Sequence, residues 1–148
     1  MTVNDFINQN NLLPADVIVV GKKNINLLDH YVIYMGEDNG NHWFIANIID
    51  KGVTWLSESD VQEYIIRYAP KGLRRFPHGI ERRREAVELA INKVGEGYNL
   101  ITYNCEHFAN EVQFRKAESK QVDDVAKGLL TVTVSALLIG GIASLLKG

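Results

Sequence analysis

The chain has 148 residues, of which 46% are hydrophobic, and a formal net charge of −2. This length fits one domain with a hydrophobic core, and the near-neutral charge gives no general attraction for nucleic acid. The single cysteine, Cys105, excludes an intrachain disulfide and a zinc site built on several cysteines. We therefore expect a reducing compartment.

The first half of the chain predicts one short helix followed by strands. Thr2 and Asp5 have the spacing of a capping box, and the opening residues lack the basic and then apolar layout of a secretory signal. Runs of β-branched and aromatic residues predict strands at residues 17–21, 30–36, 42–50 and 53–56. Asn39-Gly40 is a strong signal for a hairpin turn between the second and third runs.

The second half predicts helices. Cap-type residues open a short helix at 57–69, and an apolar stripe predicts another at 81–94, which ends at Gly95. The stripe returns at Cys105, Phe108, Ala109 and Val112, so a last helix begins close to Cys105. The order of elements predicts an α+β domain over residues 1–125, with a small antiparallel sheet packed on helices.

The C-terminal segment 126–148 has a different composition. Nineteen residues from Gly128 to Leu146 carry no charge, which is near the ~20 residues that a membrane-spanning helix needs. Ala136, Gly140 and Ser144 are spaced four apart, as small residues are in packed membrane helices. We expect an apolar helix that anchors the chain by its tail and can self-associate, although a short buried helix has a similar composition.

Cys105 is the first candidate for chemistry. A free cysteine often packs as a small hydrophobic residue. In the first turn of a helix, however, the dipole and the free N–H groups favour the thiolate and lower the thiol pKa. Asn104 is a suitable N-cap, and nearby backbone N–H groups could stabilise an oxyanion. This position suits a nucleophile, which then requires a base.

Four histidines could supply that base. His78 lies in a turn-like sequence, and His107 is two residues beyond Cys105 on the same helix, so it points away from the thiol. His30 and His42 begin the two strands of the predicted hairpin. A turn centred on residues 38–40 gives strand pairs whose numbers sum to about 77–79, and an odd sum places His30 and Asn47 on one face and His42 on the other.

The hairpin geometry therefore favours Cys105 as nucleophile, His30 as base and Asn47 as the side chain that orients the imidazole. His42 remains the alternative third member. It meets His30 only if the hairpin turns at Gly36, which would place Asp38, Asn39 and Gly40 in a strand, where such residues are disfavoured.

The segment YNLITYNCEHFANEV (98–112) resembles the NCEHF box of the lecithin:retinol acyltransferase-like family, which includes the HRAS-like suppressor phospholipase/acyltransferases. Upstream, HYVIYMG resembles the family's histidine box, and ADVIVV its early strand. RRREAVELAINKVGEGYNL and SKQVDDV resemble the segments on either side of the cysteine helix. The resemblance covers residues 12 to 125.

This resemblance implies a circularly permuted papain-like fold of the NlpC-like superfamily, in which the histidine precedes the cysteine. The family's third catalytic member is usually a second histidine twelve residues after the first, which is the spacing of His30 and His42. The loop EDNGN is longer than the family's tight hairpin, so strand alignment puts Asn47 at that place. Papain-like enzymes accept asparagine in this role.

The implied activity is that of a phospholipase A or acyltransferase. Cys105 attacks a glycerophospholipid ester, releases a lysophospholipid, and passes the acyl group to water, an amine or a hydroxyl. No cofactor or metal is required. The expected location is the cytoplasmic face of a membrane, and the basic stretch KGLRRFPHGIERRR (71–84) could face anionic lipid or simply be solvated.

Two other functions fit the same residues. A permuted cysteine peptidase, similar to deubiquitinases and deSUMOylases, has a similar early histidine and an NC-x-x-F box. A non-catalytic, membrane-tethered interaction module could keep the fold without the second histidine. The apolar tail and Glu106-His107 after the cysteine favour lipid over peptide.

Overall fold

The computed structural model describes residues 1–21, 29–68, 70–124 and 127. Its contacts divide the chain into residues 1–118 and 119–148. In the second unit, residues 120–124 are helical, and the Ser119 hydroxyl accepts a hydrogen bond from the N–H of Val122. The expected C-terminal helix lies almost wholly outside the described residues. All elements named below belong to the first unit.

A five-stranded antiparallel sheet forms the centre of this unit, with strand order β4-β3-β2-β1-β5. The strands are β1 (Val17–Val20), β2 (His30–Asp38), β3 (Asn41–Ile48), β4 (Gly52–Leu56) and β5 (Pro70–Arg74). The first four confirm the predicted strands, whereas β5 was not predicted. The α+β class and the antiparallel sheet are therefore as the sequence predicts.

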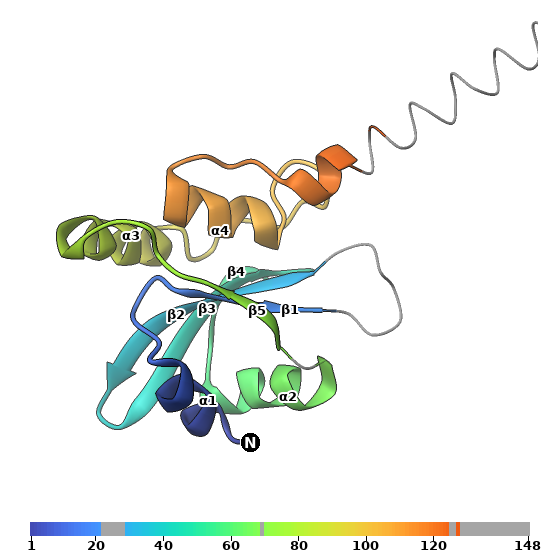
Figure 1. Ribbon diagram of the computed structural model, residues 1–148. Helices are drawn as coiled ribbons and strands as arrows, with labels where there is room; N and C mark the ends of the chain where they lie inside the picture. The colour runs from blue at the N-terminus through green and yellow to red at the C-terminus, as the bar shows by residue number, and fades with distance from the viewer. Residues whose placement is uncertain (22–28, 69, 125–126, 128–148) are drawn as a thin grey trace, which may run out of the picture. The chain divides into compact units, whose positions relative to one another are not determined.

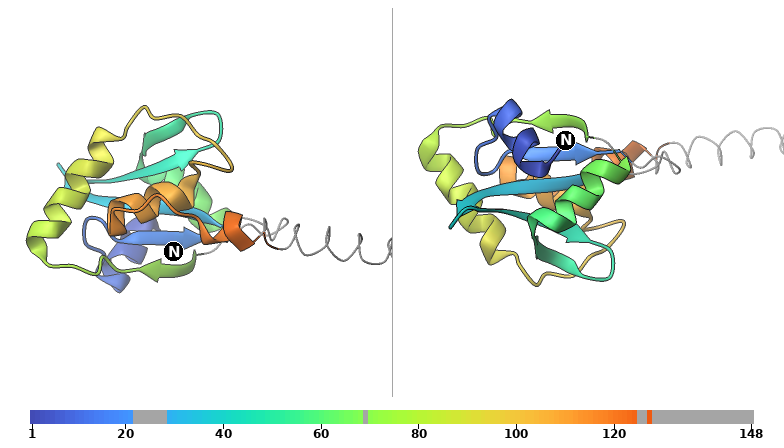
Figure 2. Two further views of the ribbon diagram at one scale, coloured as in Figure 1. Left: turned by 90° about the horizontal axis from the view of Figure 1, so that it is seen from above. Right: turned by 90° about the horizontal axis from the view of Figure 1, so that it is seen from below.

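Helices cover both faces of the sheet (Figure 1). They are α1 (Val3–Asn10), α2 (Glu58–Tyr68), α3 (Ile80–Asn92) and α4 (Cys105–Phe114). Figure 2 shows α3 and α4 from above the sheet and α1 and α2 from below it, with α4 across the central strands. All four helices confirm the sequence prediction, and α1 has the predicted capping box between Thr2 and Asp5.

Each face of the sheet has its own hydrophobic core, because successive strand residues point to opposite faces. Val32, Tyr34 and Phe44 belong to the core beneath α1 and α2. Tyr31, Ile33 and Ile45 belong to the core beneath α3 and α4, which includes Cys105 and Phe108. The side of the sheet on which a residue emerges therefore decides which core it joins.

The β2–β3 hairpin differs from the prediction in its loop. Its turn has two residues, Asn39 and Gly40, with φ of 52° and 79°, as a type I′ turn requires. Glu37, Asp38 and Asn41 are already in the strands. The expectation of a longer EDNGN loop was wrong, because Asn39 and Gly40 alone supply both left-handed conformations.

A bulge at Met35 changes the register within this hairpin. The numbers of paired residues sum to 79 from Asp38↔Asn41 to Gly36↔Trp43, and to 78 from Tyr34↔Phe44 onward. Both sums lie in the predicted range. The extra residue reverses which side chains share a face beyond the bulge, and this matters for the candidate site.

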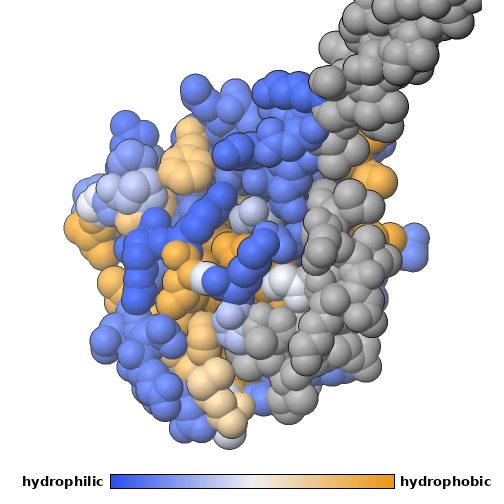
Figure 3. Space-filling view, turned by 45° about the vertical axis from the view of Figure 1, so that its right-hand side comes forward, coloured by the Kyte–Doolittle hydropathy of each residue, from blue (hydrophilic) through white to orange (hydrophobic). Residues whose placement is uncertain are grey.

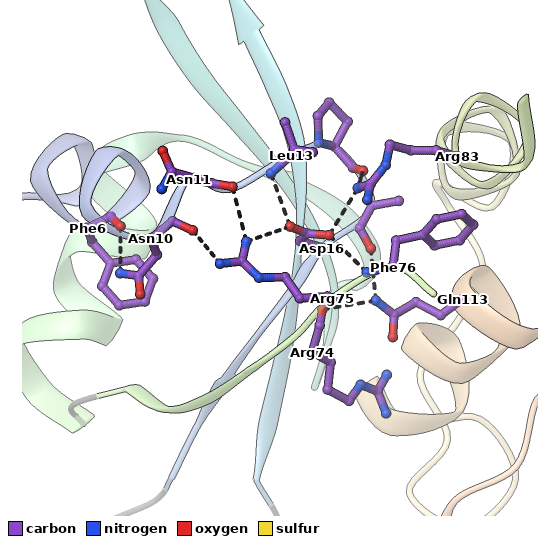
Figure 4. A network of polar contacts seen from close by, with 12 residues as sticks. Phe6, Asn10, Asn11, Leu13, Asp16, Arg74, Arg75, Phe76, Arg83 and Gln113 are labelled. Carbon is purple, nitrogen blue, oxygen red and sulfur yellow. Dashed lines mark hydrogen bonds and ion pairs between the residues drawn. The ribbon is translucent and has the colours of Figure 1, made fainter. Parts of the chain in front are cut away.

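A polar network around Asp16 joins β1 to the segment between β5 and α3 (Figure 4). The Asp16 carboxylate is buried, forms ion pairs with Arg75 and Arg83, and accepts hydrogen bonds from the N–H groups of Leu13 and Phe76. Burial opposes ionisation, but these hydrogen bonds and cations outweigh it and lower the pKa of Asp16. The ionised carboxylate therefore ties three segments together.

Candidate functional site around Cys105

Cys105 is the first residue of α4, as the sequence predicts. Asn104 is the N-cap, and its Oδ1 accepts hydrogen bonds from the N–H groups of Glu106 and His107 at 2.9 and 3.1 Å. The Nδ1 atom of His107 in turn accepts one from the N–H of Asn104 at 3.2 Å. This reciprocal cap fixes the start of the helix and gives His107 a structural role.

The thiol of Cys105 is buried against the start of β2. Its side chain is 6% exposed, and Sγ donates a hydrogen bond to the carbonyl oxygen of Asp29 at 3.3 Å. The sulfur therefore lies beneath the surface of the protein. Figure 3 shows hydrophobic side chains near the middle of the face that it turns forward, with hydrophilic ones above them.

The expected lowering of the thiol pKa is not observed. Burial raises the pKa of Cys105 to about 11, although the backbone N–H groups of Tyr31, Cys105 and Glu106 act to lower it. The helix start thus acts in the predicted direction, but removal of the sulfur from water has the larger effect. Cys105 is a neutral thiol in this state.

His30, the predicted base, is the first residue of β2 and pairs with Val20. Val20, Val32 and Tyr34 belong to the core beneath α1 and α2, so alternation directs the His30 side chain toward that face. The expectation that His30 and Asn47 share a face was wrong. The bulge at Met35 makes the sum of paired numbers even at this end of the hairpin.

Asn47 lies on β3, buried on the α4 side of the sheet. Its Nδ2 donates a hydrogen bond to the carbonyl of Tyr103 at 2.8 Å, just before the cysteine helix. Its Oδ1 is buried and has no hydrogen-bond partner among the described residues. A buried oxygen that accepts no hydrogen bond lowers the stability of the folded protein. An imidazole N–H is one group that could donate this hydrogen bond.

The sheet opens between β2 and β3 beside these residues. The pairs between the two strands end at Ile33↔Ile45, after which β2 pairs with β1 and β3 with β4. A cavity of about 10 Å³ lies here, and its lining includes His30, Asn47 and Cys105. The structure therefore brings the three predicted residues around one small cavity, although His30 and Asn47 belong to rows on opposite faces of the sheet.

His42, the alternative third member, lies elsewhere. Its Nδ1 is 2.8 Å from the hydroxyl of Tyr34, and its Nε2 is 3.3 Å from Oδ1 of Asn4 in α1. Along β3 it is five residues from Asn47, or about 16 Å. The structure does not bring His42 to Cys105.

A polar group around Glu106 includes Tyr31 and Arg74, which were not singled out from the sequence, whereas Glu106 was noted only as a neighbour of the cysteine. The Tyr31 hydroxyl donates a hydrogen bond to Oε1 of buried Glu106 at 3.4 Å, and the Arg74 guanidinium lies 5.0 Å from the centre of the Tyr31 ring. Burial, followed by the nearby Glu106 charge, raises the pKa of Tyr31. The positions of Tyr31 and Glu106 directly after His30 and Cys105 were the available signal.

The basic stretch 71–84 is largely occupied with internal contacts. Lys71 pairs with Asp29, and Arg75 and Arg83 pair with Asp16. Arg74 donates a hydrogen bond to Asn110, while Arg82 and Arg84 pair with glutamates of their own helix. These contacts use part of the stretch, while the side chains of Lys71, Arg82 and Arg84 stay largely exposed.

Comparisons of the chain with models of protein families, with curated proteins and with solved structures find no match. In the part of the chain that the structure describes, no helix is long and apolar enough to span a membrane. That part also holds no group of three or more His, Cys, Asp or Glu side chains placed to bind a metal ion.

Proposed function

We propose that the protein is a thiol-dependent phospholipase A or acyltransferase that acts on glycerophospholipid esters through an acyl thioester at Cys105. The proposal includes a circularly permuted papain-like arrangement, with the histidine strand before the cysteine helix. The observation that carries it is the contact between the helix start and β2: Sγ of Cys105 lies 3.3 Å from the carbonyl oxygen of the residue before His30. The NCEHF and HYVIYMG segments supply the choice of substrate class.

The neutral thiol requires that its proton leave during the reaction. His30 accepts the proton from Sγ, and the sulfur attacks the ester carbonyl carbon. The N–H groups of Cys105 and Glu106, which already act on the sulfur, stabilise the oxyanion. His30 then gives the proton to the leaving oxygen of the lysophospholipid. Water, an amine or a hydroxyl takes the acyl group and releases the thiol.

Asn47 acts as the orienting side chain in this proposal. Its buried Oδ1 atom has no partner among the described residues and can accept a hydrogen bond from the imidazole of His30. The thiol must also become accessible, because the cavity beside it is too small for an ester. Substrate binding therefore includes a local opening between β2 and β3, where the strands are already unpaired.

The proposal places the domain at the cytoplasmic face of a membrane, held by a tail helix at residues 126–148 that can self-associate, with phospholipid as its partner and no nucleic acid. Its support is the uncharged run from Gly128 to Leu146. Fractionation of cells that express the full chain or a chain ending at Val125 tests it. Membrane recovery of the full chain alone is expected, and equal distribution of both would contradict the anchor.

The chemistry is tested by intact mass. The full chain is incubated with phosphatidylcholine vesicles, and the expected result is one added acyl group that hydroxylamine removes. Because Cys105 is the only cysteine, Cys105→Ala must abolish the adduct. An adduct that persists in this variant would contradict the proposal.

Two further reagents separate the other functions. Labelling of Cys105 by ubiquitin with a C-terminal vinyl sulfone, without acylation by lipid, identifies a permuted cysteine peptidase. A non-catalytic interaction module is favoured by one observation, the buried thiol with its raised pKa. Inertness toward both reagents in a folded protein would establish that alternative.

A further inference from the structure

A second hollow lies at the opposite end of the same sheet. It has a volume of about 530 Å³, and the side chains that shape it are those of Met35, Asp38, Trp43, Trp55, Val87 and Ile91. This volume is in the range of small-molecule sites. Along β2 the hollow is about 20 Å from the residues that contact Cys105, so it is separate from the proposed reaction centre.

Two tryptophans form one wall of this hollow. The rings of Trp43 and Trp55 are perpendicular, with centroids 6.2 Å apart, and the side chains are 37% and 40% exposed. Trp43 is paired with Gly36, which has no side chain to cover the ring. The other wall is apolar, because Val87 and Ile91 lie one turn apart on α3.

Uncompensated negative charge borders the same hollow. Gly36 pairs with Trp43 and Asp38 with Asn41, so Asp38 emerges on the same side of the hairpin as the Trp43 ring. Glu37, between Gly36 and Asp38, emerges on the opposite side together with its pair His42. Among the described residues, Asp38 forms no ion pair, and the only side chain that donates a hydrogen bond to its carboxylate is that of Asn39.

The geometry points to a binding site for an organic ammonium cation that carries an apolar group. The faces of tryptophan rings attract cations, the carboxylate of Asp38 supplies the opposite charge, and the apolar wall of α3 takes the hydrocarbon part. A neutral hydrocarbon would pack against the apolar side chains but would gain nothing from the charge of Asp38. An anion would be repelled by Asp38.

The chain contains a built-in probe for this site, because its only two tryptophans are Trp43 and Trp55. Tryptophan fluorescence of the full chain is titrated with hexyltrimethylammonium, 1-hexanol and hexanesulfonate, which share a six-carbon chain and differ in charge. We expect a saturable change with the cation, with affinity roughly fivefold or more above that for hexanol, and no saturation with the sulfonate. Equal binding of hexanol, or no saturable change with the cation, would overturn the assignment.

Two aspartates make a matched pair of variants. Asp38→Asn removes the charge beside the tryptophans and should weaken the cation several-fold while leaving hexanol unchanged. Asp50→Asn makes the same change in the exposed turn at the other end of the sheet and should leave the cation affinity unchanged. Cys105→Ala should bind as wild type, so the result is independent of the proposed acyl transfer. Equal loss in both aspartate variants would contradict a local role for Asp38.

Discussion

At the scale of one residue, two opposing effects act on the pKa of the Cys105 thiol. The start of α4 directs N–H groups at the sulfur, whereas burial removes the thiolate from water, and burial has the larger effect. A buried thiol with a raised pKa supplies little of the thiolate that reacts as a nucleophile. Its chemistry then depends on a base and on an opening event, which is why His30 is central to the proposed mechanism.

The raised pKa of Cys105 predicts a specific loss of stability at alkaline pH. The folded protein keeps the thiol proton up to about pH 11, whereas an unfolded thiol loses it near its ordinary pKa of 9.0. The stabilisation is therefore complete below pH 9 and disappears as the pH rises toward 11, by about 3 kcal/mol in total. Urea unfolding of wild type and Cys105→Ser across this range measures it. Parallel curves would contradict a buried neutral thiol.

Asp16 provides a second prediction at this scale. Asp16→Asn leaves Arg83, which is only 14% exposed, without its ionic partner, and we expect a loss of about 3 kcal/mol in the free energy of unfolding. Lys71→Gln is the control, because its pair with Asp29 is more exposed and should contribute less than about 1 kcal/mol. Equal losses in chemical denaturation would show that the Asp16 network is not a structural centre.

At the scale of elements, the β2–β3 hairpin determines the candidate site. Its turn, its strands and its approximate register follow from local signals, above all Asn39-Gly40. The bulge at Met35 does not, because a single extra residue depends on contacts across the sheet. Because the bulge makes the sum of paired numbers even beyond it, His30, in the row of Val32 and Tyr34, and Asn47 emerge on opposite faces of the sheet.

The backbone conformation next to this bulge favours glycine at position 36. Its φ is +108°, and an added Cβ would lie 3.2 Å from Cγ of Pro14. We therefore expect Gly36→Ala to cost about 1–3 kcal/mol. Gly72→Ala is the matched control, since the space around Gly72 is open. Similar melting temperatures for the two variants would contradict the bulge geometry.

At the scale of the whole unit of residues 1–118, one sheet separates two hydrophobic cores, and this explains the limits of prediction from sequence. The N-caps of α1 and α4, the first four strands and the start of α4 are encoded by neighbouring residues, so they were predicted correctly. β5 was missed because Pro70, Lys71 and Gly72 lack a strand pattern, and it forms by pairing with β1. The Tyr31–Glu106 contact and the thiol burial depend on packing between distant segments, which no local pattern reports.

The proposed function requires that Cys105, His30 and Asn47 act together at the end of the sheet where β2 and β3 are not paired. The measurement is the single-turnover rate of Cys105 acylation by dihexanoylphosphatidylcholine, followed by intact mass in wild type, His30→Gln and His42→Gln, each checked for folding by circular dichroism. Loss of the general base in His30→Gln should slow acylation by about 10²–10⁴-fold, whereas His42→Gln should remain close to wild type. An unchanged rate in His30→Gln, or an equal loss in His42→Gln, would contradict the account.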